Sequence, residues 1–234
     1  GTFQNQIFQM IEGEKLGSFW GYTFAGVWQE DDVNAPFVDA NGQTNGKTNG
    51  EVYKVKPGNS KYVDVNKDGV YNDADQGIIG CGQPTFNWGW NNTFNYKNFD
   101  FSFFVVGFHG FDIYNATHQM GYNLIKSQQM AGVTPMRELL NRWTPTNTNT
   151  DIPGFVKGGT ENKDFFSTRF VENGSFIKMK SITLGYTLPE ATCRSLGINN
   201  LRVYASVQNP FHITKYSGLD PEATMGSPLV QGVD

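Results

Sequence analysis

Residues 84–96 read PTFNWGWNNTFNY, and large aromatic side chains occupy almost every second position of this stretch. The even positions from Phe86 to Tyr96 are aromatic except Asn92, and the odd positions are all threonine, asparagine or glycine. A period of two predicts a β-strand with two chemically opposite faces. An apolar face and a polar face are typical of a membrane barrel strand, which meets lipid on one side and water on the other. A strand of a soluble sandwich gives the same alternation, so the neighbouring sequence has to distinguish the two folds.

The composition favours an all-β protein. The 234 residues include 19 Phe, 10 Tyr, 5 Trp and 27 Gly, and only 17% are charged. A net charge of −4 without a basic cluster predicts no nucleic-acid partner. No run approaches the ~18 apolar residues of a transmembrane helix, which a barrel does not need. The chain starts at Gly1 without a signal peptide and stops at Asp234 in loop-like sequence, so we expect a piece of a longer polypeptide.

Three further strands share the alternation. A tight turn at Lys97 and Asn98 leads into a second strand, Phe99–Phe108, and each arm of this hairpin is long enough to cross a bilayer at a tilt. Phe176–Leu188 and Leu201–Gln208 repeat the same apolar and polar alternation. Upstream, Gly13–Gln29 predicts one curved strand or a strand with a kink, because interior glycines mark bulges or bends.

The connections between these strands differ greatly in length. Glu30–Gly50 has the composition of a loop, and a long insertion runs from Gly110 to about Phe166. Within the insertion, TPMRELLNRW predicts a helix with Thr134 as N-cap and Pro135 at its first position. Short turns that alternate with long loops are typical of outer-membrane barrels, whose turns face the periplasm and whose loops face outside.

A possible metal-binding loop, DVNKDGVYNDAD, lies between Asp64 and Asp75. Oxygen donors stand at its first, third and fifth positions, a glycine at its sixth and an acid at its twelfth, which is the spacing of an EF-hand type calcium loop. The predicted Ca²⁺ ligands are Asp64, Asn66, Asp68, the backbone carbonyl of Val70, and Asp75. The ion would be structural and would stabilise an extracellular loop. The alternative is a solvated turn rich in Asp and Asn.

The sequence contains no catalytic constellation, which predicts that the chain is not an enzyme. Its three histidines are scattered, and spacing suggests no Ser-His-Asp or Cys-His pairing. Cys81 and Cys193 are too few for a disulfide scaffold and lack zinc-ligand spacing. If the strands are placed correctly, Cys81 lies beyond the extracellular rim and Cys193 at a periplasmic turn. The two would then be too far apart to form a disulfide.

Several longer motifs together resemble one protein family. They are DVNKDGVYNDADQGIIG (64–80), PTFNWGWNNTFNYKNFDFSFF (84–104), FVENGSFIKMKSITLGYTLP (170–189) and LRVYASVQNPFHITKYSGLDPE (201–222). In this order they look like the C-terminal barrel region of SusC/RagA-type TonB-dependent outer-membrane transporters. The resemblance extends over most of the chain from Gly13 to Glu222.

The resemblance implies a fold, a location and partners. The fold is part of a 22-stranded transmembrane antiparallel β-barrel, with long extracellular loops that contain short helices. Residues 1–234 would be the C-terminal barrel segment, without the plug domain and the final strand. The location is the bacterial outer membrane, and the function is active import of oligosaccharides or peptides. The partners are a SusD-type surface lipoprotein that covers the barrel, TonB through an N-terminal region absent from these residues, and the lipid bilayer.

Two other hypotheses compete with import. One is a soluble carbohydrate-binding module, a β-sandwich stabilised by calcium at the Asp64–Asp75 loop. The other is a dockerin-like module, which needs a second such loop, and the sequence contains no repeat of it. In the long insertion, Tyr114 and Trp143 are candidates for stacking on a sugar or, alternatively, for packing the loop or contacting the lid lipoprotein.

Overall fold

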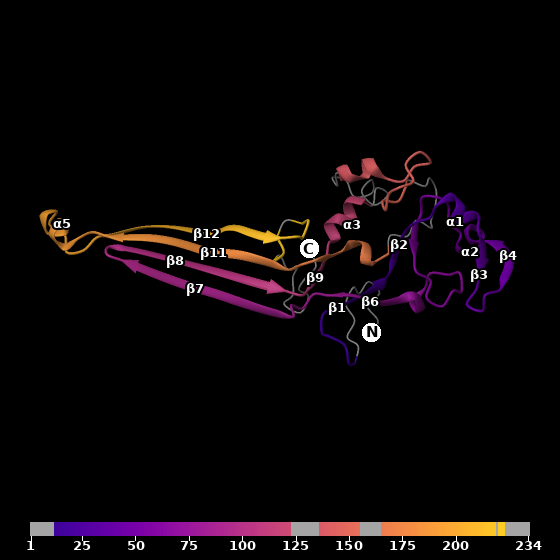
Figure 1. Cartoon of the computed structure of the whole chain (residues 1–234), viewed down its shortest axis with the longest axis horizontal. Helices are drawn as coiled ribbons and strands as arrows, with labels where there is room; N and C mark the ends of the chain where they lie inside the picture. The colour runs from indigo at the N-terminus through magenta and orange to yellow at the C-terminus, as the bar shows by residue number, and fades with distance from the viewer. Residues whose placement is uncertain (1–11, 123–135, 155–164, 219, 223–234) are drawn as a thin grey trace.

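The computed structural model describes residues 12–122, 136–154, 165–218 and 220–222. Figure 1 shows an elongated molecule in which a long sheet projects from a cluster of short strands and helices. The sheet has four strands: β7 (Phe86–Tyr96), β8 (Phe99–His109), β11 (Phe176–Thr187) and β12 (Arg202–Thr214). They lie in the order β12-β11-β8-β7, and all neighbours are antiparallel. The four strands and the turn at Lys97 and Asn98 confirm the predicted all-β organisation of this region.

β12 is longer than predicted, because it continues past Gln208 to Thr214. It does so through an irregularity shared with β11. Lys180 has no partner on β8, since the residues on either side of it pair with consecutive residues of that strand. On β12, two residues, Asn209 and Pro210, lie opposite the single residue Lys180. Asn209 has a backbone φ of 47°. Proline cannot donate to a strand ladder, and such a bulge removes it from the pairing.

The short strands form four two-stranded sheets. β1 (Ser18–Tyr22) pairs with β6 (Gln76–Cys81), and β2 (Phe24–Val27) pairs with β5 (Ser60–Tyr62). β3 (Pro36–Val38) pairs with β4 (Thr44–Thr48), and β9 (Asp112–Tyr114) pairs with β10 (Val171–Asn173). The kinked strand predicted from Gly13 to Gln29 is therefore two strands that separate at Thr23 and join different partners.

The predictions for the connections were partly wrong. Glu30–Gly50, expected to be a loop, contains α1 (Glu30–Asn34), β3, β4 and the start of α2 (Asn49–Tyr53). The helix expected to begin at Thr134 is a 3-10 helix, η2 (Arg137–Asn141), with Met136 at its N-cap, and Thr134 and Pro135 lie outside the described residues. The remaining helices within the described residues are α3 (Ala116–Tyr122), α5 (Glu190–Ser195), η1 (Asp73–Asp75) and η3 (Thr168–Phe170).

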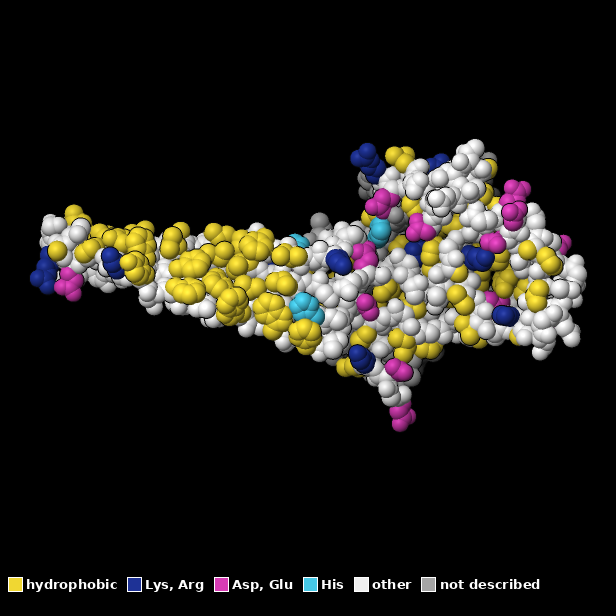
Figure 2. Space-filling view, in the orientation of Figure 1, with side chains coloured by type: hydrophobic (Ala, Val, Ile, Leu, Met, Phe, Trp, Pro, Cys, Tyr) yellow, Lys and Arg dark blue, Asp and Glu magenta, His cyan; other side chains and the backbone are white. Residues whose placement is uncertain are grey.

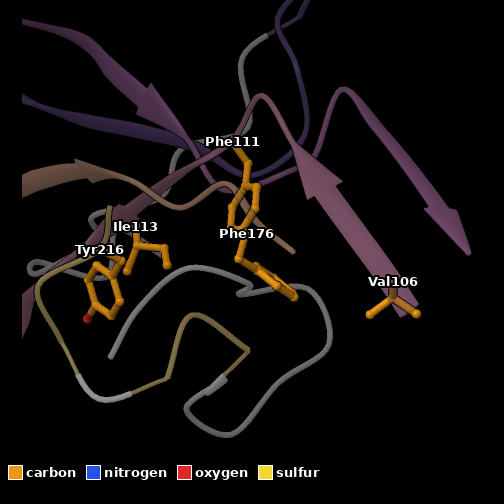
Figure 3. Close-up of a cluster of buried hydrophobic side chains, with 5 residues drawn as sticks. All are labelled: Val106, Phe111, Ile113, Phe176 and Tyr216. Atoms are coloured by element: carbon orange, nitrogen blue, oxygen red, sulfur yellow. The ribbon is translucent and has the colours of Figure 1, made fainter. Parts of the chain in front are cut away.

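Buried apolar side chains gather where the long sheet meets the cluster. One group consists of Val106, Phe111, Ile113, Phe176 and Tyr216. Figure 3 shows Phe111 beside Phe176 and Ile113 beside Tyr216, with Val106 farther along β8. A second group consists of Phe19, Tyr114 and Phe170. Of all apolar side chains on the four long strands, only Val106 and Phe176 are buried. The projecting part of the sheet is therefore a single layer, and no core accompanies it within the described residues. No helix among those residues has the length and apolar character to cross a membrane.

Candidate functional site

The register of the four long strands places most of their apolar side chains on one face, which we call the apolar face. The exceptions are Phe104, Val106, Phe108 and Phe176, which lie on the opposite face. Figure 2 shows hydrophobic side chains along most of the projecting sheet. The face comprises Phe86, Trp88, Trp90, Phe94 and Tyr96 of β7; Phe99, Phe101, Phe103 and Val105 of β8; Ile177, Met179, Ile182, Leu184 and Tyr186 of β11; and Val203, Ala205, Val207, Phe211 and Ile213 of β12.

These side chains are exposed to an extent that water does not favour. Trp90 is 55% exposed, Leu184 50% and Val207 54%. Soluble monomers rarely expose contiguous apolar patches of more than a few hundred Å². A soluble sandwich would cover this face with a second sheet, and the described residues supply none. The face therefore fits an apolar surrounding such as lipid.

The opposite face of the same sheet, called the polar face, carries hydroxyl, amide and charged groups. Its members include Asn87, Asn91, Thr93 and Asn95 of β7; Asp100 and Ser102 of β8; Ser181, Thr183 and Thr187 of β11; and Arg202, Tyr204, Ser206 and Gln208 of β12. The hydroxyl oxygens of Thr183 and Ser206 lie 2.9 Å apart, within hydrogen-bond distance. Cross-strand polar contacts of this kind suit a wall that faces water.

An ion pair that the sequence interpretation missed crosses three strands of the polar face. Arg202 donates to both carboxylate oxygens of Asp100, at 3.0 and 2.5 Å. Between them lies Gly185 of β11, where an added Cβ would collide with both charged groups. Opposite charges on the same face are visible in the sequence, but only the strand register brings these two together.

The Asp64–Asp75 loop is held by hydrogen bonds between its own carboxylates and its backbone. One oxygen of Asp64, Oδ2, accepts from the Gly69 backbone N–H at 2.8 Å and from the Tyr53 hydroxyl at 2.8 Å. Gly69 has φ 83°, and an added Cβ there would collide with Val52. At the other end, buried Asp75 accepts from the backbone N–H groups of Val65 and Asn72. The sharp turn predicted for Gly69 is present.

The predicted metal ligands mostly have partners inside the loop. Asn66 Oδ1 accepts from the Asp68 backbone N–H, and Asp68 Oδ1 accepts from the Val70 N–H. The Val70 carbonyl accepts from Asn72. The Oδ1 atom of Asp64 is buried and has no hydrogen-bond partner among the described residues. Across those residues, no group of three acidic, histidine or cysteine side chains is arranged to hold a metal ion.

Two tyrosines beside the loop keep their protons to high pH. Burial, then the hydrogen bond to Asp64 and nearby negative charges, raise the pKa of Tyr53 far above its usual range. Burial likewise raises the pKa of Tyr71 to about 12. On the loop itself, the backbone N–H of Val70 is the main cause that lowers the pKa of Asp68. At neutral pH the loop therefore presents ionised Asp68, and Tyr53 remains a hydrogen-bond donor to Asp64.

Two cavities in the cluster are lined by described residues. One, of about 220 Å³, adjoins the Asp64–Asp75 loop and is lined by Tyr53, Tyr62, Tyr71 and Phe165 among others. The other, of about 230 Å³, is lined by charged and polar groups, including His118, Glu138, Asp151 and Arg169. His118 Nε2 lies 3.0 Å from Glu138. Both cavities are large enough for one ring or one side chain of a ligand.

The two aromatic residues proposed for stacking on a sugar serve the packing of the insertion. Tyr114 is fully buried among Phe19 and Phe170. The Trp143 ring lies against Gly58 and Gly154, and its indole N–H donates to Gln29 at 2.9 Å. The packing alternative is therefore the one that the structure supports for both.

The two cysteines are unpaired, as predicted. Cys81 ends β6 in the cluster, and Cys193 lies in α5, in the connection from β11 to β12. Figure 1 places β6 and α5 at opposite ends of the long sheet. Cys193 is buried, and Cys81 is half-buried.

Comparison with known proteins gives sequence relatives and similar structures. No protein-family model matches the chain. "TonB-dependent receptor P3" of Formosa agariphila is 35% identical over 220 residues, which are 94% of this chain and 20% of that protein. "TonB-dependent receptor SusC" of Bacteroides thetaiotaomicron is 32% identical over 173 residues, which are 73% of this chain and 16% of that protein. The chain thus spans about a fifth of the length of these relatives.

Solved structures agree on the fold. The RagAB peptide importer in its "open-open" state matches with a TM-score of 0.64 and 20% identity, over 100% of this chain and 23% of the other. The RagAB peptide transporter matches with a TM-score of 0.63 and 21% identity. These matches and the two faces of the sheet agree with the sequence relatives. The chain belongs to the SusC/RagA-type family of TonB-dependent receptors, which are β-barrel proteins of the bacterial outer membrane.

Proposed function

We propose that this chain is a C-terminal part of the barrel wall of a transporter that imports oligosaccharides or peptides across the outer membrane. The observation that carries the proposal is the single-layered sheet with one apolar and one polar face. Such a sheet is stable where lipid covers one face and a water-filled lumen the other. Four strands cannot close a barrel, so the remaining strands of the proposed 22 come from the rest of the polypeptide.

The lengths of the connections support an orientation for this wall. The turn at Lys97 and Asn98 and the connection that contains α5 lie at the free end of the sheet (Figure 1). The cluster with the Asp64–Asp75 loop lies at the other end. We assign the free end to the periplasm and the cluster to the cell exterior, as in barrels with short inner turns and long outer loops. Phe94 and Tyr96 then belong to the inner aromatic girdle, and Phe86 and Trp88 to the outer one.

The partners and substrates follow from the family. We assign import energy to TonB, acting through a part of the receptor outside this chain, and a covering role to a SusD-type lipoprotein. The RagAB structures are named as a peptide importer, which supports peptides as one of the two substrate classes. The function is therefore transport, and we assign no catalytic step to these residues.

The same proposal includes a structural Ca²⁺ ion in the Asp64–Asp75 loop. Asp64, Asn66, Asp68, the carbonyl of Val70, and Asp75 would hold it. The buried, unpartnered Oδ1 of Asp64 supports this, because a buried carboxylate oxygen without a partner is costly and a cation would satisfy it. The ion would stabilise the fold of the loop and take no part in chemistry.

Fractionation and uptake test the proposed function. We expect the full-length receptor to fractionate with the outer membrane and to need detergent for extraction. Cells that lack it should lose uptake of a labelled oligosaccharide or of a labelled peptide, and cells that lack TonB should lose the same uptake. Recovery of the full-length protein as a soluble monomer would contradict the proposal and favour the sandwich module.

A further inference from the structure

Two lysines of β11 project from the polar face at the shared irregularity of β11 and β12, and both bind acids that follow β12. Lys178 Nζ lies 3.0 Å from Asp220 and 2.6 Å from Glu222. Lys180 Nζ lies 2.6 Å from the other carboxylate oxygen of Glu222. One glutamate therefore bridges two lysines, and one lysine bridges two acids.

The burial of Lys178 makes this cluster unusual. Its side chain is only 8% exposed, whereas lysine is almost never buried without an ionic partner. A buried charge whose partner is removed is strongly destabilising. The position of Lys178 on the sheet therefore depends on the acids that reach it.

The chain has to double back to make these contacts. Lys178 pairs in the sheet with His212, two residues before β12 ends at Thr214. Glu222 is eight positions after Thr214 in sequence, yet it contacts Lys178 and Lys180, which lie beside earlier parts of β12. The described residues 215–218 and 220–222 thus return along the polar face of β12.

Further contacts fix the bend of this return. The Thr214 hydroxyl donates to the Ser175 carbonyl at 3.1 Å, and Tyr216 enters the apolar group of Figure 3. Ser217 donates to Glu172 through its backbone N–H at 2.8 Å and through its hydroxyl at 2.7 Å. Contacts of Thr214, Tyr216 and Ser217 therefore fix the segment that precedes the acids. This segment directs Asp220 and Glu222 toward the two lysines.

We propose that Lys178 and Lys180 form a carboxylate seat on the polar face, and that residues 220–222 are a latch that occupies this seat. The latch holds the start of the segment after β12 against the sheet. The irregularity at Lys180 supports the seat, because bulges redirect side chains and interrupt pairing where a strand has a specific task. That the latch lies inside a lumen rests on the proposed function, whereas the latch itself rests only on the contacts above.

Proteolysis of the full-length receptor in detergent tests the latch. We expect Asp220→Asn with Glu222→Gln to increase the rate of chymotrypsin cleavage within residues 214–222 at least about tenfold, followed by mass spectrometry. The matched control is Glu190→Gln, which removes an ion pair with Arg194. Both side chains of that pair are exposed, Glu190 by 84% and Arg194 by 80%. This substitution should leave the cleavage rate unchanged. Wild-type cleavage in the doubly neutralised variant would overturn the latch.

A third substitution separates the latch from a general loss of stability. Adding Lys178→Met to the two neutralised acids removes the unpaired buried charge, so the unfolding temperature should return toward that of the wild type. Cleavage of residues 214–222 should stay fast, because the two acids of the latch remain neutralised. If cleavage slowed to the wild-type rate together with the recovery of stability, charge pairing would not be what holds the segment. Neither readout requires that the receptor import anything.

Discussion

Arg202 and Asp100 are 102 residues apart in sequence, and they form a two-point ion pair across the polar face over the backbone of Gly185. The pair links β12 to β8 and passes over the strand between them. Only a residue without a side chain leaves room for it. The long sheet is therefore joined laterally by side chains as well as by its backbone ladder.

Replacing Gly185 with valine should destabilise the barrel. The added methyl groups would displace Asp100 and Arg202, and overpacking of this kind costs about 1–3 kcal/mol. We expect a lower unfolding temperature of the full-length receptor in detergent, measured by circular dichroism. Gly77→Ala in β6 is the control, because an added Cβ there meets nothing within 4 Å. Equal stability of the Gly185 variant and wild type would show that the ion pair does not need this gap.

Arginine should be tolerated on one face of β11 and rejected on the other. Leu184→Arg places a charge on the apolar face and should cost about 2–4 kcal/mol if that face lies near the bilayer midplane. Thr183→Arg, one residue away on the polar face, should lose only a hydrogen bond to Ser206. The measurement is the amount of folded receptor in the outer membrane. Similar losses for both variants would contradict the assignment of the faces.

Calcium should bind the Asp64–Asp75 loop and depend on Asp64. We expect isothermal titration of the full-length receptor to give a dissociation constant of roughly 10⁻⁴–10⁻³ M, the range of extracellular calcium modules. Asp64→Asn should abolish binding, whereas Asp73→Asn should preserve it, since Asp73 is not among the predicted ligands. Chelation should also speed proteolysis of the loop. An unchanged calcium isotherm in the Asp64 variant would rule out this site.

The latch should open only in acid. Burial by itself raises the pKa of Glu222 and of Asp220, but hydrogen bonds to each carboxylate outweigh it. Glu222 accepts from Lys178 and Lys180, which hold its pKa below the ordinary 4.5. Asp220 accepts from the backbone N–H of Glu222 and from Lys178, which hold its pKa below the ordinary 3.8. Carboxyls with lowered pKa stabilise the folded form above their unfolded pKa, and this stabilisation is lost as the pH falls through the folded pKa.

Protection of residues 214–222 from an acid-active protease such as pepsin should therefore fail below about pH 4 in the wild type. The variant with both acids neutralised should be cleaved quickly by pepsin in acid and by chymotrypsin near neutral pH. A wild-type protein whose protection already fails between about pH 5 and 7 would contradict the assigned groups.

The long strands could be predicted because their pattern is local. Alternation from Phe86 to Tyr96 fixes two faces without knowledge of any partner, and the brief turn at Lys97 fixes the hairpin. The end of β12 could not be predicted, because Pro210 argues against a strand and only the bulge opposite Lys180 accommodates it. The helix expected at Thr134 rested on capping residues, and the described part of that segment forms a 3-10 helix instead.

The ionic contacts of the polar face needed the register as well. Nothing in the sequence marks Asp100 and Arg202 as partners, and the same is true of Lys178 and Glu222. Their contacts depend on which strands pair and on where the chain turns back after β12. The short strands β3 and β4 lie in a segment rich in Asn, Gly and Thr, whose composition is that of a loop. The turn at Gly69 was predictable because the loop spacing is local, and the calcium ion at Asp64 stays a prediction.

In the proposed barrel wall, β11 separates lipid from water. This separation can be measured with a nitroxide label placed at each position from Ser181 to Thr187 of the full-length receptor in bilayers, with Cys81 and Cys193 replaced by serine. Collision with oxygen reports contact with lipid, and collision with a water-soluble nickel chelate reports contact with water. We expect oxygen maxima at Ile182, Leu184 and Tyr186 and nickel maxima at Ser181, Thr183, Gly185 and Thr187. Two profiles that rise and fall together along the strand would show that β11 does not separate lipid from water.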